Sequence, residues 1–338
     1  MPRRISNPPN PWASTHVEWL DEAPVAELEV YEEEAKAVLS ENDSPDVGFR
    51  FSVNPYRGCA HACAYCYARP SHQYLGFGAG TDFDRRIVVK INAPEVLARE
   101  LARSSWRRDT VVFSGNTDCY QPLEASYRLT RRCLEVCLAR RTPVGLITKG
   151  TLIRRDIDVL SKLARGPGAQ VHVSIPFLEE EVGRKLEPGA SSPNKRFETL
   201  KLLSEAGIPT GISIAPLIPG LNESDVPRLL ERAAECGAKS AFLTLLRLPA
   251  EVLPVFQERL HEAFPERAKK IESAIRDMRG GELNQSAFGQ RMSGHGPRWD
   301  AIERLFEIHC RRFGINETEG YESGTRRAAP TTQGELFG

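Results

Sequence analysis

The sequence lacks any long, uninterrupted apolar run. Its most apolar stretch, residues 241–256, contains Arg247, Glu251 and two prolines, so it would cross a bilayer only at high cost. The first twelve residues carry charge but no apolar segment, so they do not resemble a secretory signal. We therefore expect a cytoplasmic protein that does not enter the membrane.

The chain also has no net charge, because its 45 lysines and arginines balance its 45 aspartates and glutamates. This balance excludes a strongly basic protein that coats nucleic acid non-specifically, but it leaves room for a local basic groove. Only 10 of these cations are lysines. The arginine excess suits phosphate or carboxylate recognition, although biased codon usage is the simpler explanation.

Cysteine is sparse, with eight residues in 338. That number is too small for a disulfide scaffold, so in a reducing compartment the cysteine spacing points to metal binding or catalysis. Cys59, Cys63 and Cys66 form a C-x3-C-x2-C pattern directly after a strand-like run. Thiolate ligands select zinc or iron–sulfur clusters.

The number of ligands separates the possible metal sites. A closed zinc site or a ferredoxin-type cluster needs four protein ligands, and the next cysteine is Cys119. His61 or His72 would have to complete a zinc site. Three thiolates on a four-iron cube instead leave one iron open for a substrate or cofactor, which is a catalytic arrangement.

Hydrophobic patterning predicts a repeated strand–helix architecture. Nearly continuous apolar runs are typical of parallel strands covered on both faces, and they lie at residues 49–53, 87–91, 110–114, 144–148, 171–175, 211–215 and 241–245. Helical segments are predicted at residues 94–105, 126–141, 153–165, 195–206 and 224–236. Strand starts recur about every 30 residues, the size of one strand–helix unit. The pattern predicts an α/β fold, either a doubly wound sheet or a full or partial barrel.

Four segments are expected along the chain. Residues 1–47 are predicted to be a partly disordered N-terminal extension, with helical periodicity over residues 27–41. Residues 48–279 form the core barrel, with one or two closing helices after residue 249, and residues 280–315 a C-terminal helical segment. The polar residues 316–338 are expected to be a disordered tail.

The segment CAHACAYC is similar to the C-x3-C-x-(aromatic)-C signature of the radical S-adenosylmethionine (radical SAM) superfamily. The wider pattern resembles the branch related to spore photoproduct lyase over about residues 48–250. The matching segments are the cysteine loop with its YAR, GNTDCYQPLE, LITKG, RRDID, VSIPF, KLEPGA and APLIPGLNES. This resemblance implies a partial (β/α)6 barrel with N- and C-terminal extensions.

The resemblance also implies cofactors and chemistry. Cys59, Cys63 and Cys66 would ligate one 4Fe–4S cluster per chain, and S-adenosylmethionine would chelate its fourth iron. A low-potential donor, a ferredoxin or flavodoxin, would supply the electron that cleaves the cofactor to methionine and a 5′-deoxyadenosyl radical. That radical would abstract hydrogen from a substrate, in a lyase- or oxidoreductase-type reaction. The substrate could be nucleic acid, as in DNA repair, or a protein or small molecule; a non-catalytic cluster or zinc module is the remaining alternative.

Cofactor contacts are expected where barrel active sites lie, at the carboxyl ends of strands. The candidates are Tyr65, Ser114, Gly115, Thr117, Asp118, Lys149, Ser174 and Ala215. The resemblance implies that Tyr65 packs near adenine, that the turn at residues 114–118 binds the methionine ammonium, and that Lys149 pairs with its carboxylate. Ser174 would bond a ribose hydroxyl and the backbone of Ala215 would border adenine. The alternatives are an ordinary turn, a solvated lysine and a satisfied strand serine.

The sequence departs from spore photoproduct lyase at the position of that enzyme's hydrogen donor. The lyase has a cysteine in the turn after this strand, where this chain has Asn116. It also has a tyrosine pair after the last cluster cysteine, whereas here Tyr67 precedes Ala68. Thymine-dimer repair is therefore not predicted. Tyr67 and Cys119 are candidate catalytic residues that relay a radical.

Several other residues receive only structural expectations. Asp156 is expected to cap a helix. Glu187 and Arg196 belong to the branch's pattern without an assigned role. Buried positions as small apolar side chains are expected for Cys133, Cys137, Cys236 and Cys310.

The chain ends in TTQGELFG, in which Gln333, Leu336 and Phe337 form a Q-x-x-L-F pattern. The pattern resembles short peptides by which bacterial DNA-replication and repair proteins dock on the sliding clamp. Such a peptide needs a flexible tether, one amide and an apolar pair. Docking would bring the enzyme to DNA, whereas chance or packing of the pair on the barrel is the alternative.

Overall fold

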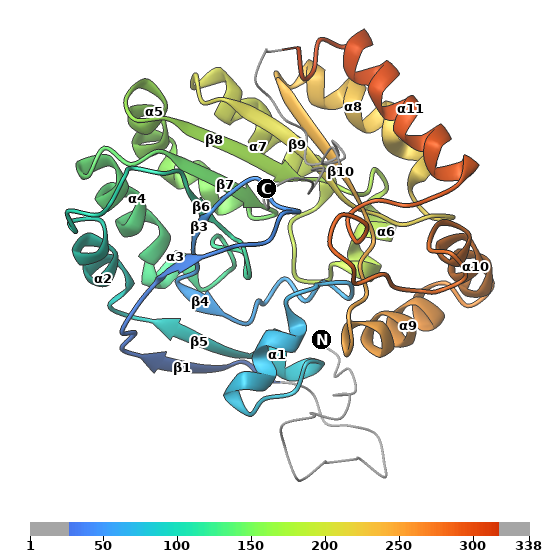
Figure 1. The fold of residues 1–338 in the computed structure, drawn as a ribbon, viewed down its shortest axis with the longest axis horizontal. Coiled ribbons are helices and arrows are strands. Elements are labelled where there is room, and N and C mark those ends of the chain that lie inside the picture. The colour runs from blue at the N-terminus through green and yellow to red at the C-terminus, as the bar shows by residue number, and fades with distance from the viewer. Residues whose placement is uncertain (1–26, 318–338) are drawn as a thin grey trace, which may run out of the picture.

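The centre of the computed structural model, which describes residues 27–317, is a seven-stranded sheet (Figure 1). Its order is β10-β9-β8-β7-β6-β3-β2. Six strands are parallel: β3 Phe51–Val53, β6 Val111–Phe113, β7 Val144–Thr148, β8 Ala169–Ser174, β9 Thr210–Leu217 and β10 Ser240–Leu245. β2 (Leu39–Glu41) runs antiparallel to β3. Because β2 and β10 lie at opposite edges, the sheet is open, and the predicted partial (β/α)6 barrel is confirmed.

Helices cover the outer face of this sheet (Figure 1). They are α2 Ala93–Glu100, α4 Leu129–Ala139, α5 Ile157–Arg165, α7 Pro193–Glu205 and α8 Val226–Glu235, with α11 Pro297–Arg312 packed on α8. Strand alternation separates the two faces. On β8, Val171 and Val173 enter the main apolar core, whereas Gln170, His172 and Ser174 line a cavity on the inner face.

A second, smaller sheet corrects one expectation. Its order is β1 (Glu29–Glu33), β5 (Arg86–Lys90) and β4 (Tyr56–Arg57). The helix predicted over residues 27–41 is therefore wrong, because β1 pairs with β5 and β2 pairs with β3. The local periodicity of this acidic segment indicated a helix, but pairing with strands distant in the sequence decides its conformation. β2 also links the predicted N-terminal extension to the main sheet.

The remaining elements complete the barrel and its closing side. They are η1 Arg69–Leu75, α1 Thr81–Arg85, α3 Glu124–Tyr127, η2 Thr151–Asp156, α6 Glu180–Leu186, η3 Glu223–Asp225, α9 Val252–Ala263 and α10 Ala268–Met278. The closing segment thus forms two helices. The helix predicted from residue 126 begins at Leu129 instead, because Arg128 adopts a left-handed conformation with φ 52°.

Within residues 27–317, no helix has the length and apolar character needed to cross a membrane. Gln333, Leu336 and Phe337, together with most of the predicted tail, lie outside the described residues.

Candidate active site

One cavity of about 990 Å³ lies on the inner face of the open sheet. It extends from the cysteine loop past the carboxyl ends of the parallel strands. The structure brings all but one of the predicted site residues to its wall: Cys59, Cys63, Tyr65, Cys66, Tyr67, Ser114, Gly115, Thr117, Asp118, Lys149, Ser174 and Ala215. Residues as far apart in the sequence as Cys59 and Ala215 therefore line the same cavity.

The cysteine loop is held by backbone and arginine contacts rather than by its own side chains. Gly58 precedes it with φ 78°, and a Cβ there would lie 2.9 Å from Phe83 O, so glycine is required. The Cys59 amide donates to Phe83 O at 2.9 Å. The buried Arg69 guanidinium donates to Cys63 O at 2.8 Å and pairs with Asp84 at 2.9 Å. The loop conformation is thus anchored from outside the cavity.

The three thiols are mostly buried, with Cys59 at 7% and Cys63 at 8% exposure. Burial raises the pKa of Cys63 to about 12, and the Lys149 ammonium acts in the opposite direction. A thiolate in such a place needs a compensating cation, which a bound metal supplies. Cys119, Cys133, Cys137 and Cys310 lie elsewhere in the apolar core.

The donor set fits an iron–sulfur cube better than one zinc ion. In the part of the chain that the structure describes, no three His, Cys, Asp or Glu side chains gather for a single metal ion. A cube presents a different iron to each thiol, so its ligands need not meet at one point. His72 Nε2 lies 2.8 Å from Arg86 O, and His61 Nδ1 lies 3.3 Å from Asp118 Oδ2. These partners hold one nitrogen of each ring, and neither imidazole joins the thiols at a common metal position among the described residues.

Asp118 organises the turn that follows β6. Its carboxylate accepts hydrogen bonds from the Thr148 hydroxyl at 2.6 Å and the Lys149 amide at 2.7 Å. Burial opposes its ionisation, but His61 and these hydrogen bonds hold the pKa of Asp118 well below its usual value. Thr117 donates to Tyr56 O at 3.0 Å. Both side chains thus join β6 to neighbouring elements, and they leave mainly the turn backbone for a ligand ammonium.

Ser114 carries the unusual conformation of this turn, with φ 73°. Its hydroxyl accepts a hydrogen bond from the Cys119 amide at 3.0 Å. A Cβ on Gly115 would lie 3.2 Å from Ser52 Cβ, so this glycine allows close packing on β3.

A chain of contacts joins Lys149, Ser174 and Ala215 across three strand ends. The Lys149 ammonium donates to Ser174 Oγ at 3.0 Å, and Ser174 Oγ lies 3.4 Å from Ala215 O. The same ammonium lies 3.9 Å from Glu187 Oε1. Lys149 thus stands at the wall of the cavity rather than in bulk solvent.

Behind Lys149 lies a buried ion pair that sequence reasoning left without a role. Glu187 accepts hydrogen bonds from the Arg196 guanidinium and from the Tyr65 hydroxyl. Burial opposes ionisation of Glu187, but Arg196 and Lys149 together keep its pKa below the usual value. Two cations therefore share one carboxylate. The excess positive charge faces the cavity through Lys149, which suits a ligand carboxylate.

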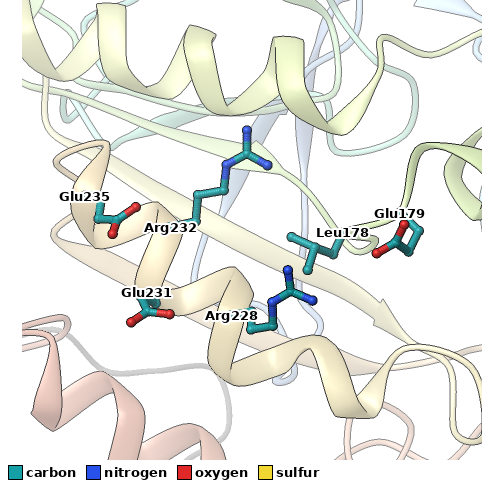
Figure 2. Close-up of a pocket in the computed structure, with 6 residues that line it drawn as sticks. All are labelled: Leu178, Glu179, Arg228, Glu231, Arg232 and Glu235. Carbon is teal, nitrogen blue, oxygen red and sulfur yellow. The ribbon is translucent and has the colours of Figure 1, made fainter.

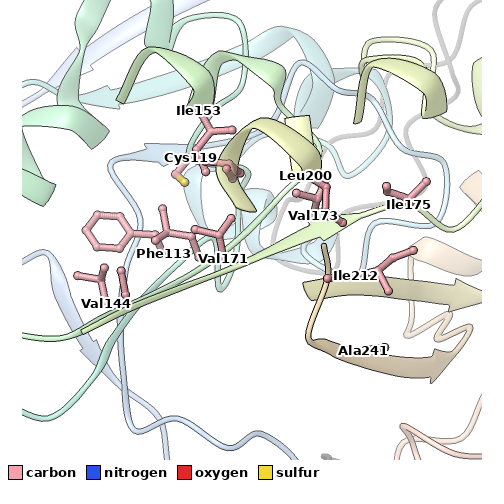
Figure 3. Close-up of a cluster of buried hydrophobic side chains, with 14 of the residues drawn as sticks. Phe113, Cys119, Val144, Ile153, Val171, Val173, Ile175, Leu200, Ile212 and Ala241 are labelled. Carbon is pink, nitrogen blue, oxygen red and sulfur yellow. The ribbon is translucent and has the colours of Figure 1, made fainter. Parts of the chain in front are cut away.

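Cys119 is the predicted site residue that does not reach the cavity. Its side chain is fully buried in the main core, which also holds Phe113 and Ile153 (Figure 3). Tyr67, in contrast, is 48% exposed at the cavity wall and donates to Gly115 O at 2.7 Å. Asn116 lines the same wall.

The helix-capping role expected for Asp156 is wrong, because its side chain makes no cap hydrogen bond at the start of α5. It pairs instead with Arg155 at 2.8 Å and Arg131 at 3.1 Å.

The sequence prediction missed Arg247 as a site residue, although Arg247 lines the cavity. Its position just after the last strand, at the carboxyl edge of the sheet, was the available signal.

Gly189 packs directly against the backbone of the cysteine loop at Ala60. A Cβ there would lie 2.0 Å from Ala60 O, which is backbone and cannot swing aside. We expect Gly189→Ala to displace the loop and to lower iron incorporation on anaerobic reconstitution. Gly183→Ala is the control, because its added Cβ would meet Pro193 at an ordinary 3.6 Å. Equal iron content in both variants would contradict this role for Gly189.

A smaller hollow of about 360 Å³ lies between α8 and the segment that contains Leu178 and Glu179 (Figure 2). Its wall is mostly charged, with Glu179, Arg228, Glu231, Arg232 and Glu235. It lies apart from the cysteine loop and brings no thiol or imidazole together, so the inner cavity is the candidate active site.

Comparisons with known proteins agree with this geometry. The model of the radical SAM superfamily matches residues 53–233. An uncharacterized protein of Mycobacterium tuberculosis is 39% identical over 230 residues, which are 68% of each chain. A radical SAM Nα-GlyT isomerase of Pseudomonas phage M6 is 27% identical over 83% of this chain and 55% of its own. Among solved structures, spore photoproduct lyase complexed with dinucleoside spore photoproduct is similar, with a TM-score of 0.63 and 15% identity over 85% of this chain and 80% of the lyase chain.

Proposed function

The chain belongs to the radical SAM superfamily, and we propose that it cleaves S-adenosylmethionine reductively and abstracts hydrogen from a nucleic-acid substrate. The observation that carries the proposal is the single cavity that joins the three-cysteine loop, the Lys149 ammonium and a wide inner space. Membership of the superfamily implies a 4Fe–4S cluster and S-adenosylmethionine. It also implies a reductant, for which we propose a ferredoxin or flavodoxin.

The chain's own residues would bind and orient these groups. Cys59, Cys63 and Cys66 would hold three irons of the cluster, and the fourth would stay open toward the cavity. When bound and reduced, the cluster supplies the electron that splits S-adenosylmethionine into methionine and a 5′-deoxyadenosyl radical. Lys149 would pair with the methionine carboxylate, and the turn backbone at residues 114–118 would accept from its ammonium.

The remaining contacts would place the nucleoside part of the cofactor. Ser174 and the backbone of Ala215 stand on the next two strand ends and would border the ribose and adenine. The Tyr65 ring lies beneath Lys149, with Nζ 5.7 Å from the ring centroid. Its hydroxyl is held by Glu187, so the ring would form a fixed wall beside the adenine. We do not assign a radical relay to the buried Cys119; Tyr67 keeps that proposed role.

One similar structure supports a nucleic-acid substrate. The solved lyase structure contains a dinucleoside spore photoproduct. Thymine-dimer repair itself is not proposed, because Asn116 stands where the lyase has its donor cysteine. The amide cannot donate a hydrogen atom as a thiol does.

The proposal is tested by anaerobic turnover with dithionite. We expect 5′-deoxyadenosine to form, and deuterium to pass into it from a deuterated oligonucleotide. Transfer from a peptide or small molecule instead would overturn the substrate class and keep the radical chemistry. Protein that takes up zinc but no iron and sulfide would support a non-catalytic metal-binding module.

Lys149→Ala is expected to weaken S-adenosylmethionine binding by about 10- to 100-fold, because a charge-assisted contact is worth roughly 1.5–3 kcal/mol. Iron content should stay unchanged, since the Lys149 ammonium contacts Ser174 and Glu187 and makes no hydrogen bond or ion pair with a cysteine among the described residues. Equilibrium binding to the anaerobic holoprotein measures the effect, and the exposed Lys162→Ala is the control. An unaltered dissociation constant for Lys149→Ala would rule the contact out.

We also propose that Gln333, Leu336 and Phe337 dock on a sliding clamp, supported by the sequence pattern alone. A labelled peptide of residues 325–338 is expected to bind a bacterial clamp at micromolar concentration. A peptide with alanine at Leu336 and Phe337 should not bind, because the apolar pair fills the pocket. Equal binding of the two peptides would remove the proposal without affecting the cofactor chemistry.

A further inference from the structure

Arginine side chains gather on the cavity wall where the chain leaves β10 and in the loop after α10. Arg247 and Arg291 both line the cavity there, and Arg279 lies behind them. Asp46 is the carboxylate on this wall, and it pairs with Arg291. Of the three guanidinium groups, only Arg291 therefore has a carboxylate partner on this wall, in a protein whose overall net charge is zero.

Two of the three guanidinium groups are occupied by protein acceptors. Arg291 pairs with Asp46 and also donates to Ser44 Oγ. Arg279 donates to Ser293 O in the loop after α10 at 2.9 Å and to Leu246 O, directly after β10, at 2.7 Å. These bonds hold the loop in place, so neither group is available to a ligand without local rearrangement.

Arg247 differs from both. Among the described residues, Arg247 contacts Met292 Sδ at 3.7 Å and the Tyr67 ring, whose centroid lies 5.5 Å from Cζ. It makes no ion pair with a carboxylate within residues 27–317. Burial lowers the pKa of Arg247, and the nearby Arg291 charge lowers it further. The nearby Asp46 carboxylate acts in the opposite direction on this pKa, but it is already paired with Arg291. An anion bound here would therefore oppose both effects by supplying a countercharge of its own.

Exposed aromatic rings accompany these cations. Tyr67 is 48% exposed and Phe288 is 61% exposed. Each lies under a guanidinium: Tyr67 under Arg247, and Phe288 under Arg291 at 4.5 Å. Arginines interleaved with exposed rings are typical of surfaces that bind single-stranded nucleic acid, where cations contact phosphates and rings stack with bases. An acidic peptide would use the cations but would leave the two ring faces unused.

We propose that Arg247 binds a phosphodiester of a nucleic-acid strand and that Tyr67 and Phe288 stack with the adjacent bases. This inference rests on the proposed function, and it identifies where the substrate backbone binds. Tyr67 directly follows Cys66 in the chain. A nucleotide anchored on Arg247 therefore reaches the cavity next to the cysteine loop, where the cofactor would generate its radical.

Anaerobic holoprotein titrated into a fluorescein-labelled 12-residue oligothymidylate tests the site by anisotropy at several salt concentrations. Arg247→Gln is expected to weaken binding by about 10-fold or more. It should also reduce the slope of log K against log salt by about 0.7, the value for one lost phosphate contact on a single strand. Phe288→Ala should weaken binding by about 5-fold or more and leave the slope unchanged, because stacking releases no counterions.

Arg228→Gln is the matched control. Arg228 is exposed on α8 beside the smaller hollow (Figure 2), and its substitution removes the same charge. Its affinity and slope should equal those of the unaltered protein. Iron content and melting temperature establish that each variant is folded. Equal affinities for Arg247→Gln and Arg228→Gln would overturn the inference. So would equal binding of a labelled oligoglutamate with the same charge.

The two proposals fail separately. If the unaltered protein releases 5′-deoxyadenosine but oligothymidylate binding does not depend on Arg247, the radical chemistry is supported and the phosphodiester site at Arg247 is contradicted. If binding depends on Arg247 and Phe288 but no 5′-deoxyadenosine forms, the phosphodiester site is supported and the proposed reaction is contradicted.

Discussion

Alanine in place of Cys59, Cys63 or Cys66 is expected to remove the cluster and all cleavage of S-adenosylmethionine. Each thiol would hold a different iron, so a single loss leaves a corner of the cube without a protein ligand. The loop itself should stay in place, because Arg69 holds Cys63 O and the Cys59 backbone holds Phe83 O. Iron and sulfide content, the broad brown absorbance and 5′-deoxyadenosine yield measure the effect.

Other cysteines provide the matched controls. Cys310→Ala and Cys236→Ala change residues outside the cavity wall and should keep full iron content. Cys119→Ala should also keep the cluster, at some cost in stability, because Cys119 lies in the apolar core. If Cys119→Ala lost its iron, a four-cysteine electron-transfer site would become the better interpretation.

Arg196→Met is expected to destabilise the fold by ~3–5 kcal/mol, the usual cost of leaving one partner of a buried ion pair alone. Arg196 is 2% exposed and Glu187 is 1% exposed, so water cannot replace the lost partner. Lys149 Nζ, 3.9 Å from Glu187 Oε1, offers partial compensation. The cost should therefore lie near the lower end of the range. Denaturant unfolding under anaerobic conditions measures it.

The double variant Glu187→Gln/Arg196→Met separates a lone buried charge from lost packing. It should be more stable than Arg196→Met, because no unpaired carboxylate remains. Arg196→Met should also weaken S-adenosylmethionine binding although Arg196 is not part of the cavity wall, because Glu187 would then draw Lys149 away from the ligand. A double variant less stable than Arg196→Met would contradict the ion-pair explanation.

Much of the fold followed from local patterns. The parallel strands were predicted because strands buried on both faces are continuously apolar. The recurring strand–helix spacing predicted a doubly wound sheet or a barrel, and the family resemblance implied the partial barrel. The segment before β3 was misread, since its strands depend on pairing between Glu29–Glu33 and Arg86–Lys90, far apart in the chain. Local periodicity carries no information about such a partner.

The sequence by itself determined the candidate ligands and the strand-end positions, because the spacing of three cysteines and the ends of apolar runs are local properties of the chain. Only the tertiary structure decided which distant charges meet. Tyr65 and Glu187 are 122 residues apart in the sequence, and Arg247 stands over Tyr67 only because β10 ends beside the cysteine loop. Such contacts depend on how strands and loops pack around the cavity, and that packing decides which charges are neutralised within the protein and which face a ligand.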